Sequence, residues 1–135
     1  MRHYGITFYA FNLIAGGFLA DGELHERNKN GSYGNEEYFA AIELLDPVIE
    51  KYGLTLRECA LRWLAHHSLL YGEKGDAVLM GASSVAHLES SLVDLEKGPL
   101  PNEVVEALDR GWERVRRLSW KYWFWEYDNV GMEAT

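Results

Sequence analysis

The sequence has very little cysteine and no long apolar run. Cys59 is its single cysteine, so no disulfide can form within the chain, as is usual for a reducing compartment. No apolar run reaches the roughly 18 residues that a membrane-spanning helix needs. The N-terminus also lacks the pattern of a secretion signal. These absences predict a cytoplasmic protein that does not insert into a membrane.

Positive charge is scarce as well. The 135 residues include 13 Lys and Arg against 21 Asp and Glu, which gives a net charge of -8. An acidic surface repels phosphate backbones, so no nucleic-acid partner is expected. The locally basic segment 110–121 is interpreted as a solvated face near the end of a helix, where cations are favoured. The length allows one domain with a modest core.

What the sequence does contain is an apolar stretch near its N-terminus. Ile6 to Phe11 is rich in β-branched and aromatic residues, which predicts a buried strand. The chain then turns at Asn12 and enters the small-residue loop Ala15 to Gly17. Parallel α/β proteins place ligands where a buried strand ends in such a loop. We therefore expect a ligand at this edge.

A second strand and a set of helices follow. Residues 77–82 are apolar throughout, which predicts another buried strand and favours a parallel sheet. Helical spacing places Trp63, Leu88, Leu92 and Trp112 among the side chains that face the core. The helices are predicted over residues 36–52, 56–71, 85–97 and 101–118.

Local signals mark where these helices begin and end. Thr55 and Glu58 match a capping box, in which each side chain bonds to the other's backbone N–H. Pro47 should kink or divide the helix over residues 36–52. Further caps are expected at Asn35, at Gly53 and at either Ser83 or Ser84.

The sequence divides into a domain over residues 1–118 and an aromatic tail over residues 119–135. Two strands leave two open edges and a bare face, so we expect a homo-oligomer, at least a dimer. In one interpretation the tail's aromatic rings pack against the domain or form a dimer interface. In the other they line a pocket for an apolar ligand, and the two interpretations are compatible. They are Trp120, Tyr122, Trp123, Phe124, Trp125 and Tyr127.

Three segments in order, FYAFNLIAGGFL, ALRWLAHHSLL and GDAVLMGASSVAHLESSLVDLEKGPLPNEVVEALDRGWE, resemble the C-terminal part of aldo-keto reductases. The similarity is greatest to the aflatoxin-aldehyde-reductase-like group, particularly its fungal members, and covers about residues 2–118. The resemblance implies an α/β fold. It would be a helix-dominated remnant of a (β/α)8 barrel with two parallel strands and four or five helices. Residues 5–12 would be the barrel's seventh strand and residues 77–83 its eighth.

That family uses NADPH, and the resemblance implies a cofactor site here. Its pyrophosphate loop would be Asn12, Ala15, Gly16 and Gly17, with Ser83 and Ser84 at the adenosine phosphate end. The family typically has proline where this sequence has Leu13. It also has amide side chains at the positions of His87, Ser90 and Ser91. These replacements predict that no cofactor is bound, with NADP as the alternative, and they favour Ser83-Ser84 as a helix cap.

The family's catalytic Asp, Tyr, Lys and His lie in the first half of its barrel, before the part that this sequence resembles. Unaided carbonyl reduction is therefore not expected. We predict a non-redox conversion of an apolar metabolite by shape and hydrogen bonding, such as an isomerisation, a cyclisation or a Diels–Alder cycloaddition. The alternatives are a residual NADP-binding fragment, half of a reductase completed by another polypeptide, and a non-catalytic interaction module. The catalytic candidates are Tyr9, Asn12, His87 and Trp120, and the substrate-binding candidates are Phe11, Trp123 and Trp125.

Two other residue patterns are interpreted as structural. His66 and His67 are adjacent, and neighbouring residues on a helix point about 100° apart, so they do not form a chelating pair. No metal site is expected. Cys59 lies on the inward face of a predicted helix without an activating base, so we do not expect a nucleophile there.

Overall fold

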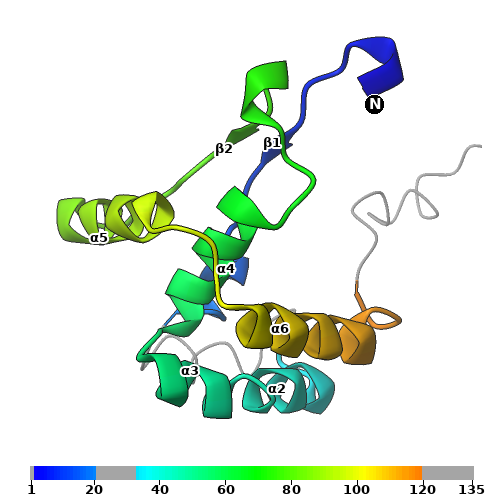
Figure 1. The fold of residues 1–135 in the computed structure, drawn as a ribbon, viewed down its shortest axis with the longest axis vertical. Coiled ribbons are helices and arrows are strands. Elements are labelled where there is room, and N and C mark those ends of the chain that lie inside the picture. Colours follow the sequence, from blue (N-terminus) through cyan, green and yellow to red (C-terminus); the bar gives the residue numbers. More distant parts are fainter. Residues whose placement is uncertain (1, 21–32, 120–135) are drawn as a thin grey trace, which may run out of the picture.

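The computed structural model describes residues 2–20 and 33–119 (Figure 1). Over these residues the fold is α/β and helix-dominated, as predicted, with two parallel strands and five α-helices. Strands β1 (Tyr9–Ala10) and β2 (Ala77–Val78) pair in register, Tyr9 opposite Ala77 and Ala10 opposite Val78. The helices are α2 (Glu36–Glu43), α3 (Asp46–Tyr52), α4 (Leu56–His66), α5 (Val85–Glu96) and α6 (Asn102–Val115).

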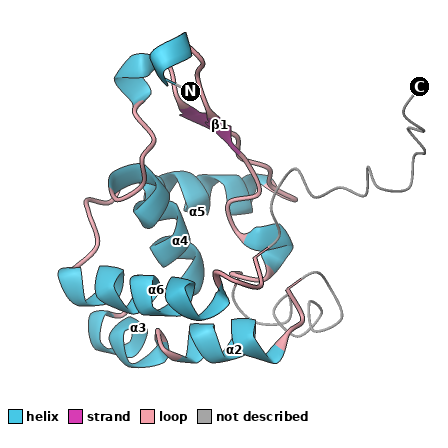
Figure 2. Ribbon diagram, turned by 90° about the vertical axis from the view of Figure 1, so that its right-hand side faces the viewer, coloured by secondary structure: helices cyan, strands magenta, loops and turns pink. Residues whose placement is uncertain are grey.

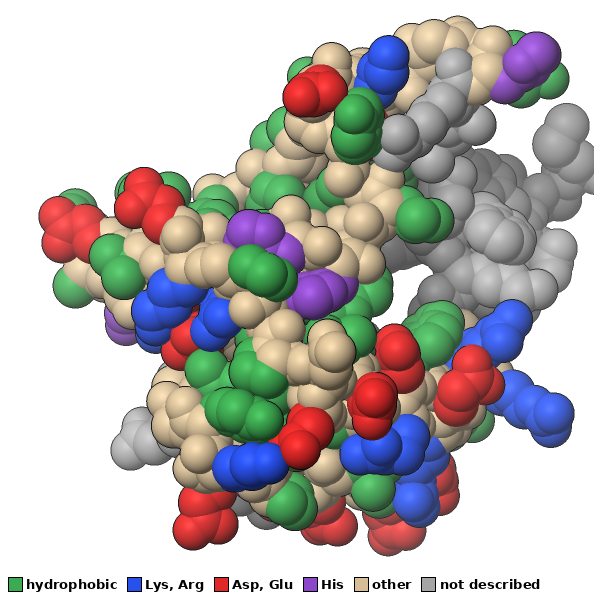
Figure 3. Space-filling model, viewed as in Figure 1, with side chains coloured by type: hydrophobic (Ala, Val, Ile, Leu, Met, Phe, Trp, Pro, Cys, Tyr) green, Lys and Arg blue, Asp and Glu red, His purple; other side chains and the backbone are tan. Residues whose placement is uncertain are grey.

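The helices α2, α3 and α6 form a layer at one end of the molecule, and the strand pair lies at the other end (Figures 1 and 2). Helix α4 connects the two ends, and α5 projects from its side. A small core at the junction of α4 and α6 contains Cys59, Leu100 and Val104, which are at most 4% exposed. Charged side chains of both signs cover much of the lower layer in the view of Figure 3.

The predicted caps determine where most helices begin. Asn35, Thr55 and Ser84 each accept a hydrogen bond from a backbone N–H two or three residues further on, at 2.8, 3.1 and 3.2 Å. These bonds satisfy donors that a helix start leaves without a partner. Pro47 lies in the first turn of α3 and divides the helix predicted over residues 36–52. Gly53 ends α3 in the left-handed conformation, with φ of 61°.

The prediction of two buried strands was wrong in extent and in burial. Only two residues of each segment pair, and the exposed fractions are 55% for Tyr9, 76% for Phe11 and 52% for Leu79. A fully apolar strand needs cover on both faces. In the described part of the chain, β1 and β2 have only each other as strand neighbours. The described residues therefore do not cover these apolar side chains, although the pattern is typical of buried strands.

Two helices also differ from their predictions. Leu88 and Leu92 of α5 were expected to face the core but are exposed, whereas Asp94 is buried. Helix α4 ends at His66 instead of continuing to residue 71, and in the turn that follows Ser68 Oγ donates to the carbonyl of Leu64 at 2.6 Å. None of the helices in the described ranges is long and apolar enough to span a bilayer. The predicted domain boundary at residue 118 stays a prediction.

The ion pair between Lys51 of α3 and Glu103 of α6 makes stability depend on pH. Hydrogen bonds from Lys51 and Tyr52 lower the pKa of Glu103 below its ordinary value. A depressed carboxyl pKa contributes stability at neutral pH that is lost as pH falls through the folded-state value. We expect Glu103→Gln to flatten the acid limb of a urea-denaturation series measured against pH. An acid limb identical to that of the wild type would contradict this.

Candidate functional site

An apolar cleft of about 490 Å³ lies between the end of β1 and the helices α4 and α6. It is within the size range of small-molecule sites, which are mostly apolar with a few polar groups. Its position at the end of the first strand agrees with the edge where the sequence predicted a ligand. The lining residues are Ala10, Phe11, Asn12, Leu13, Leu19, Leu45, Leu56, Ala60, Trp63, Leu64, Leu108, Asp109 and Trp112.

Asn12 and Asp109 are the amide and carboxyl side chains among these lining residues. The loop that follows Asn12 holds the Asn12 side chain in place. Its backbone is left-handed, with φ of 59°, a conformation that asparagine tolerates better than most residues. Its Oδ1 accepts a hydrogen bond from the N–H of Gly16 at 2.6 Å. Because Oδ1 is engaged in that bond, the amide NH₂ is the group that can donate to a ligand.

The small-residue loop uses its own N–H groups internally. Ala15 N donates to Asn12 O at 2.9 Å, Gly17 N donates to Ile14 O at 3.0 Å, and Gly16 N donates to the Asn12 side chain. A phosphate cradle needs such N–H groups to point at the anion. In this conformation these three N–H groups are bonded within the loop.

Ser83 and Ser84, which the resemblance places at the adenosine phosphate end of NADP, also form hydrogen bonds within the protein. Ser84 caps α5, and Ser83 Oγ lies 2.9 Å from Nδ1 of His87. Ser90 accepts a hydrogen bond from Arg57 at 2.8 Å. This supports the interpretation of Ser84 as a helix cap. Whether NADP binds stays a prediction in either direction.

The structure brings only some of the predicted site residues together. Phe11 and Asn12 line the cleft, whereas Tyr9 on β1 and His87 on α5 do not. The remaining candidates, Trp120, Trp123 and Trp125, lie outside the described residues.

Sequence reasoning missed two aromatic walls of the cleft, Trp63 and Trp112. Both were assigned to helix faces that point into the core, yet Trp112 is 50% exposed. A large indole is seldom buried completely, and its N–H seeks a polar partner. Two tryptophans on the inward faces of neighbouring helices were the available signal for a cleft.

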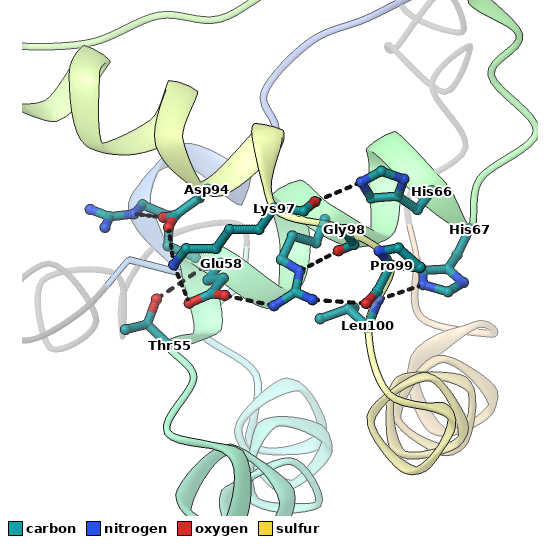
Figure 4. Close-up of polar contacts among 11 residues, drawn as sticks. Thr55, Glu58, His66, His67, Asp94, Lys97, Gly98, Pro99 and Leu100 are labelled. Carbon is teal, nitrogen blue, oxygen red and sulfur yellow. Dashed lines mark hydrogen bonds and ion pairs between the residues drawn. The ribbon is translucent and has the colours of Figure 1, made fainter.

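A polar network fixes α4 against the connection between α5 and α6 (Figure 4). Glu58, only 6% exposed, contacts Arg62 at 2.7 Å and Lys97 at 3.1 Å. Arg62 also donates to the backbone carbonyls of Gly98 and Pro99, both at 2.8 Å. The capping box thus holds only on the Thr55 side, since the Glu58 carboxylate serves this network. The network therefore holds α4, one wall of the cleft, against the residues that lead into α6, another wall.

The adjacent histidines contribute to the same connection. His66 Nε2 lies 2.7 Å from Lys97 O, and His67 Nε2 accepts a hydrogen bond from Leu100 N at 3.0 Å. The two rings thus contact different backbone groups, as Figure 4 shows. In the described ranges no three His, Cys, Asp or Glu side chains form a group that could hold a metal ion.

Burial makes Cys59 unreactive. Desolvation raises the pKa of its thiol to about 11. The thiolate is the nucleophilic form, and little of it is present near neutral pH. We expect alkylation by iodoacetamide at neutral pH to require unfolding, as measured by mass spectrometry with and without urea. Rapid labelling of the folded chain would contradict the burial.

The Asn12 turn gives a testable prediction about the loop. Asn12→Ala loses the bond to Gly16 and forces alanine into the left-handed region, whereas Asn12→Gly loses only the bond. We expect the alanine variant to be less stable than the glycine variant by about 1 kcal/mol, measured by urea denaturation. Equal stabilities would show that the left-handed turn is not formed in solution.

The fold and the site together describe a helix-rich α/β unit that carries a small-molecule cleft at the end of a parallel strand. A profile of the aldo/keto reductase family matches residues 1–113, and the chain belongs to this family. This confirms the resemblance inferred from the three sequence segments.

Individual relatives agree with this assignment. The chain is 42% identical over 132 residues to an aldo-keto reductase of Pseudocercospora fijiensis, covering 86% of this chain and 45% of that protein. It is 44% identical over 142 residues to aldo-keto reductase pigE of Monascus ruber, covering 91% and 42%. It is 39% identical over 137 residues to aflatoxin B1 aldehyde reductase member 2 of Mus musculus, covering 85% and 37%. The chain thus spans about two fifths of the length of these relatives.

Proposed function

We propose that this chain binds an apolar small molecule in the cleft and converts it without electron transfer, by isomerisation or cyclisation. The observation that carries the proposal is the composition of the cleft. Its walls are aliphatic and aromatic, and Asn12 and Asp109 supply an amide and a carboxyl group. Such a site holds an apolar molecule by burial and orients it through a few hydrogen bonds.

The chemistry available to these residues is positioning and hydrogen bonding. Confining a flexible substrate in a reactive conformation lowers the entropic part of its activation barrier, and a fixed donor can stabilise developing charge. Asn12 would be that donor, because the loop holds its side chain in one orientation. A Diels–Alder cycloaddition is one reaction that this mode of catalysis accelerates.

The test uses the mass of the product. Isomerisation and cyclisation leave the mass unchanged, whereas carbonyl reduction adds two hydrogens and consumes NADPH. The full chain is incubated with a panel of apolar polyenes and unsaturated aldehydes, once without nucleotide and once with NADPH, and products are analysed by chromatography and mass spectrometry. We expect a product of unchanged mass whose formation is lost in Asn12→Ala. NADPH-dependent reduction by the chain alone would overturn the proposal.

A second candidate function is half of a reductase that another polypeptide completes. The observation that favours it is the exposed apolar surface at the strand pair, formed by Tyr9 of β1 and by Phe8 and Leu79, which flank the two strands. Titration with NADPH, alone and with a polypeptide equivalent to the other part of a relative, would distinguish the two. Nucleotide binding that appears only in the mixture would favour this candidate.

A further inference from the structure

We propose that the aromatic segment 120–127 of this chain docks in the cleft and competes there with ligands. The cleft is the one described above, but the inference does not rest on the proposed conversion, since docking requires only an apolar surface. The contact is intramolecular, between one segment and one site of the same chain.

The chain after α6 is long enough for this segment to reach the cleft. Trp112 of α6 lines the cleft, α6 ends at Val115, and Ser119 is the last described residue. At about 1.5 Å per helical residue, Ser119 lies roughly 10 Å along the chain from Trp112. Eight further residues can extend to about 26 Å, so a reversal after Ser119 reaches the cleft with length to spare.

Composition indicates why the segment would turn back. Six of its eight residues are aromatic, and leaving them all in water forgoes the burial of a large apolar area. On the receiving side, Trp112 and Leu118 are 50% and 43% exposed. Trp112 lines the cleft, and Leu118 lies near the end of the described chain, so both offer exposed apolar surface to the segment.

Charge favours the same reversal. The C-terminal part of α6 and the turn that follows carry Arg110 and Arg117, and the segment and its flank carry Glu126 and Asp128. A chain that folds back over α6 brings these acidic residues beside the basic ones. A chain that continues away from α6 does not.

The first test is limited proteolysis of the full chain by trypsin, which cuts after Lys121. Ala60→Trp fills the cleft, and Ala65→Trp is the matched control because Ala65 lies on the exposed face of α4. We expect cleavage at Lys121 to become about tenfold faster in Ala60→Trp and to be unchanged in Ala65→Trp, since proteolysis follows the population of the open state. Equal cleavage in all three chains would overturn the proposal. Protection that increases with protein concentration would also overturn it, because the occupant would then be a second copy.

A second test does not depend on folding of the filled-cleft variant. Trp123→Ser with Trp125→Ser is compared with Val130→Ser with Met132→Ser, using an anilinonaphthalene sulfonate dye as the probe. We expect dye fluorescence to rise several-fold over wild type only in the tryptophan pair, because the cleft is then vacated. Unchanged fluorescence in that pair would contradict docking.

Discussion

Replacing Arg62 by alanine is expected to lower the free energy of unfolding by about 3 kcal/mol, the cost of removing one partner from a buried ion pair. Glu58 would keep only Lys97 as a charged partner while staying 6% exposed. The carbonyls of Gly98 and Pro99 would also lose their guanidinium donor. Urea denaturation followed by circular dichroism measures the change.

A matched control separates burial from charge. Arg114 pairs with Glu37 at 2.7 Å, as close as Arg62 is to Glu58, but both side chains are more than 40% exposed. We expect Arg114→Ala to cost less than about 1 kcal/mol, as surface pairs do. If the two variants lost equal stability, the network would not be buried in solution. Because α4 and α6 are walls of the cleft, Arg62→Ala should also weaken ligand binding.

Filling the cleft is expected to have the largest effect on binding. Ala60→Trp places an indole in the space between α4 and β1, so we expect affinity for an apolar dye to fall at least about tenfold, or roughly 1.4 kcal/mol. Fluorescence titration of the full chain measures it. Ala65→Trp adds the same ring to the exposed face of the same helix and should leave affinity unchanged. Equal loss in both variants would place the dye elsewhere.

Local sequence signals predicted the helix boundaries well. The side chains of Asn35, Thr55 and Ser84 form their caps within three residues, and Pro47 acts through its own ring, so neighbouring residues suffice to specify these features. The end of α4 could not be found this way. No glycine or proline lies between His66 and Tyr71 to mark it, and the ring of His67 contacts Leu100, a residue 33 positions further on.

Burial was harder to predict, because it depends on what lies across from each residue. Ile6 and Leu88 have the spacing of core residues but are exposed here, whereas Asp94 is buried and accepts hydrogen bonds from Arg57 and Lys97. The same limit applies to the cleft. Trp63 and Trp112 have core spacing, and only the placement of α4 and α6 shows that they face a cavity.

The predicted oligomer stays a prediction. The exposed pair of strands and the exposed leucines of α5 are the surfaces that a second copy would cover. Sedimentation velocity at micromolar concentration tests it, and a single monomeric species would contradict it.

Amide NMR of the full chain, titrated separately with an apolar dye and with NADPH, tests most directly where this protein binds its ligand. We predict that the dye shifts the resonances of residues 10–13, 60–64 and 108–112, and that NADPH leaves those of residues 12–17 and 83–84 unchanged. If NADPH instead shifted the resonances of residues 12–17 and 83–84, and the dye shifted none along the cleft, the result would contradict an apolar site and indicate nucleotide binding.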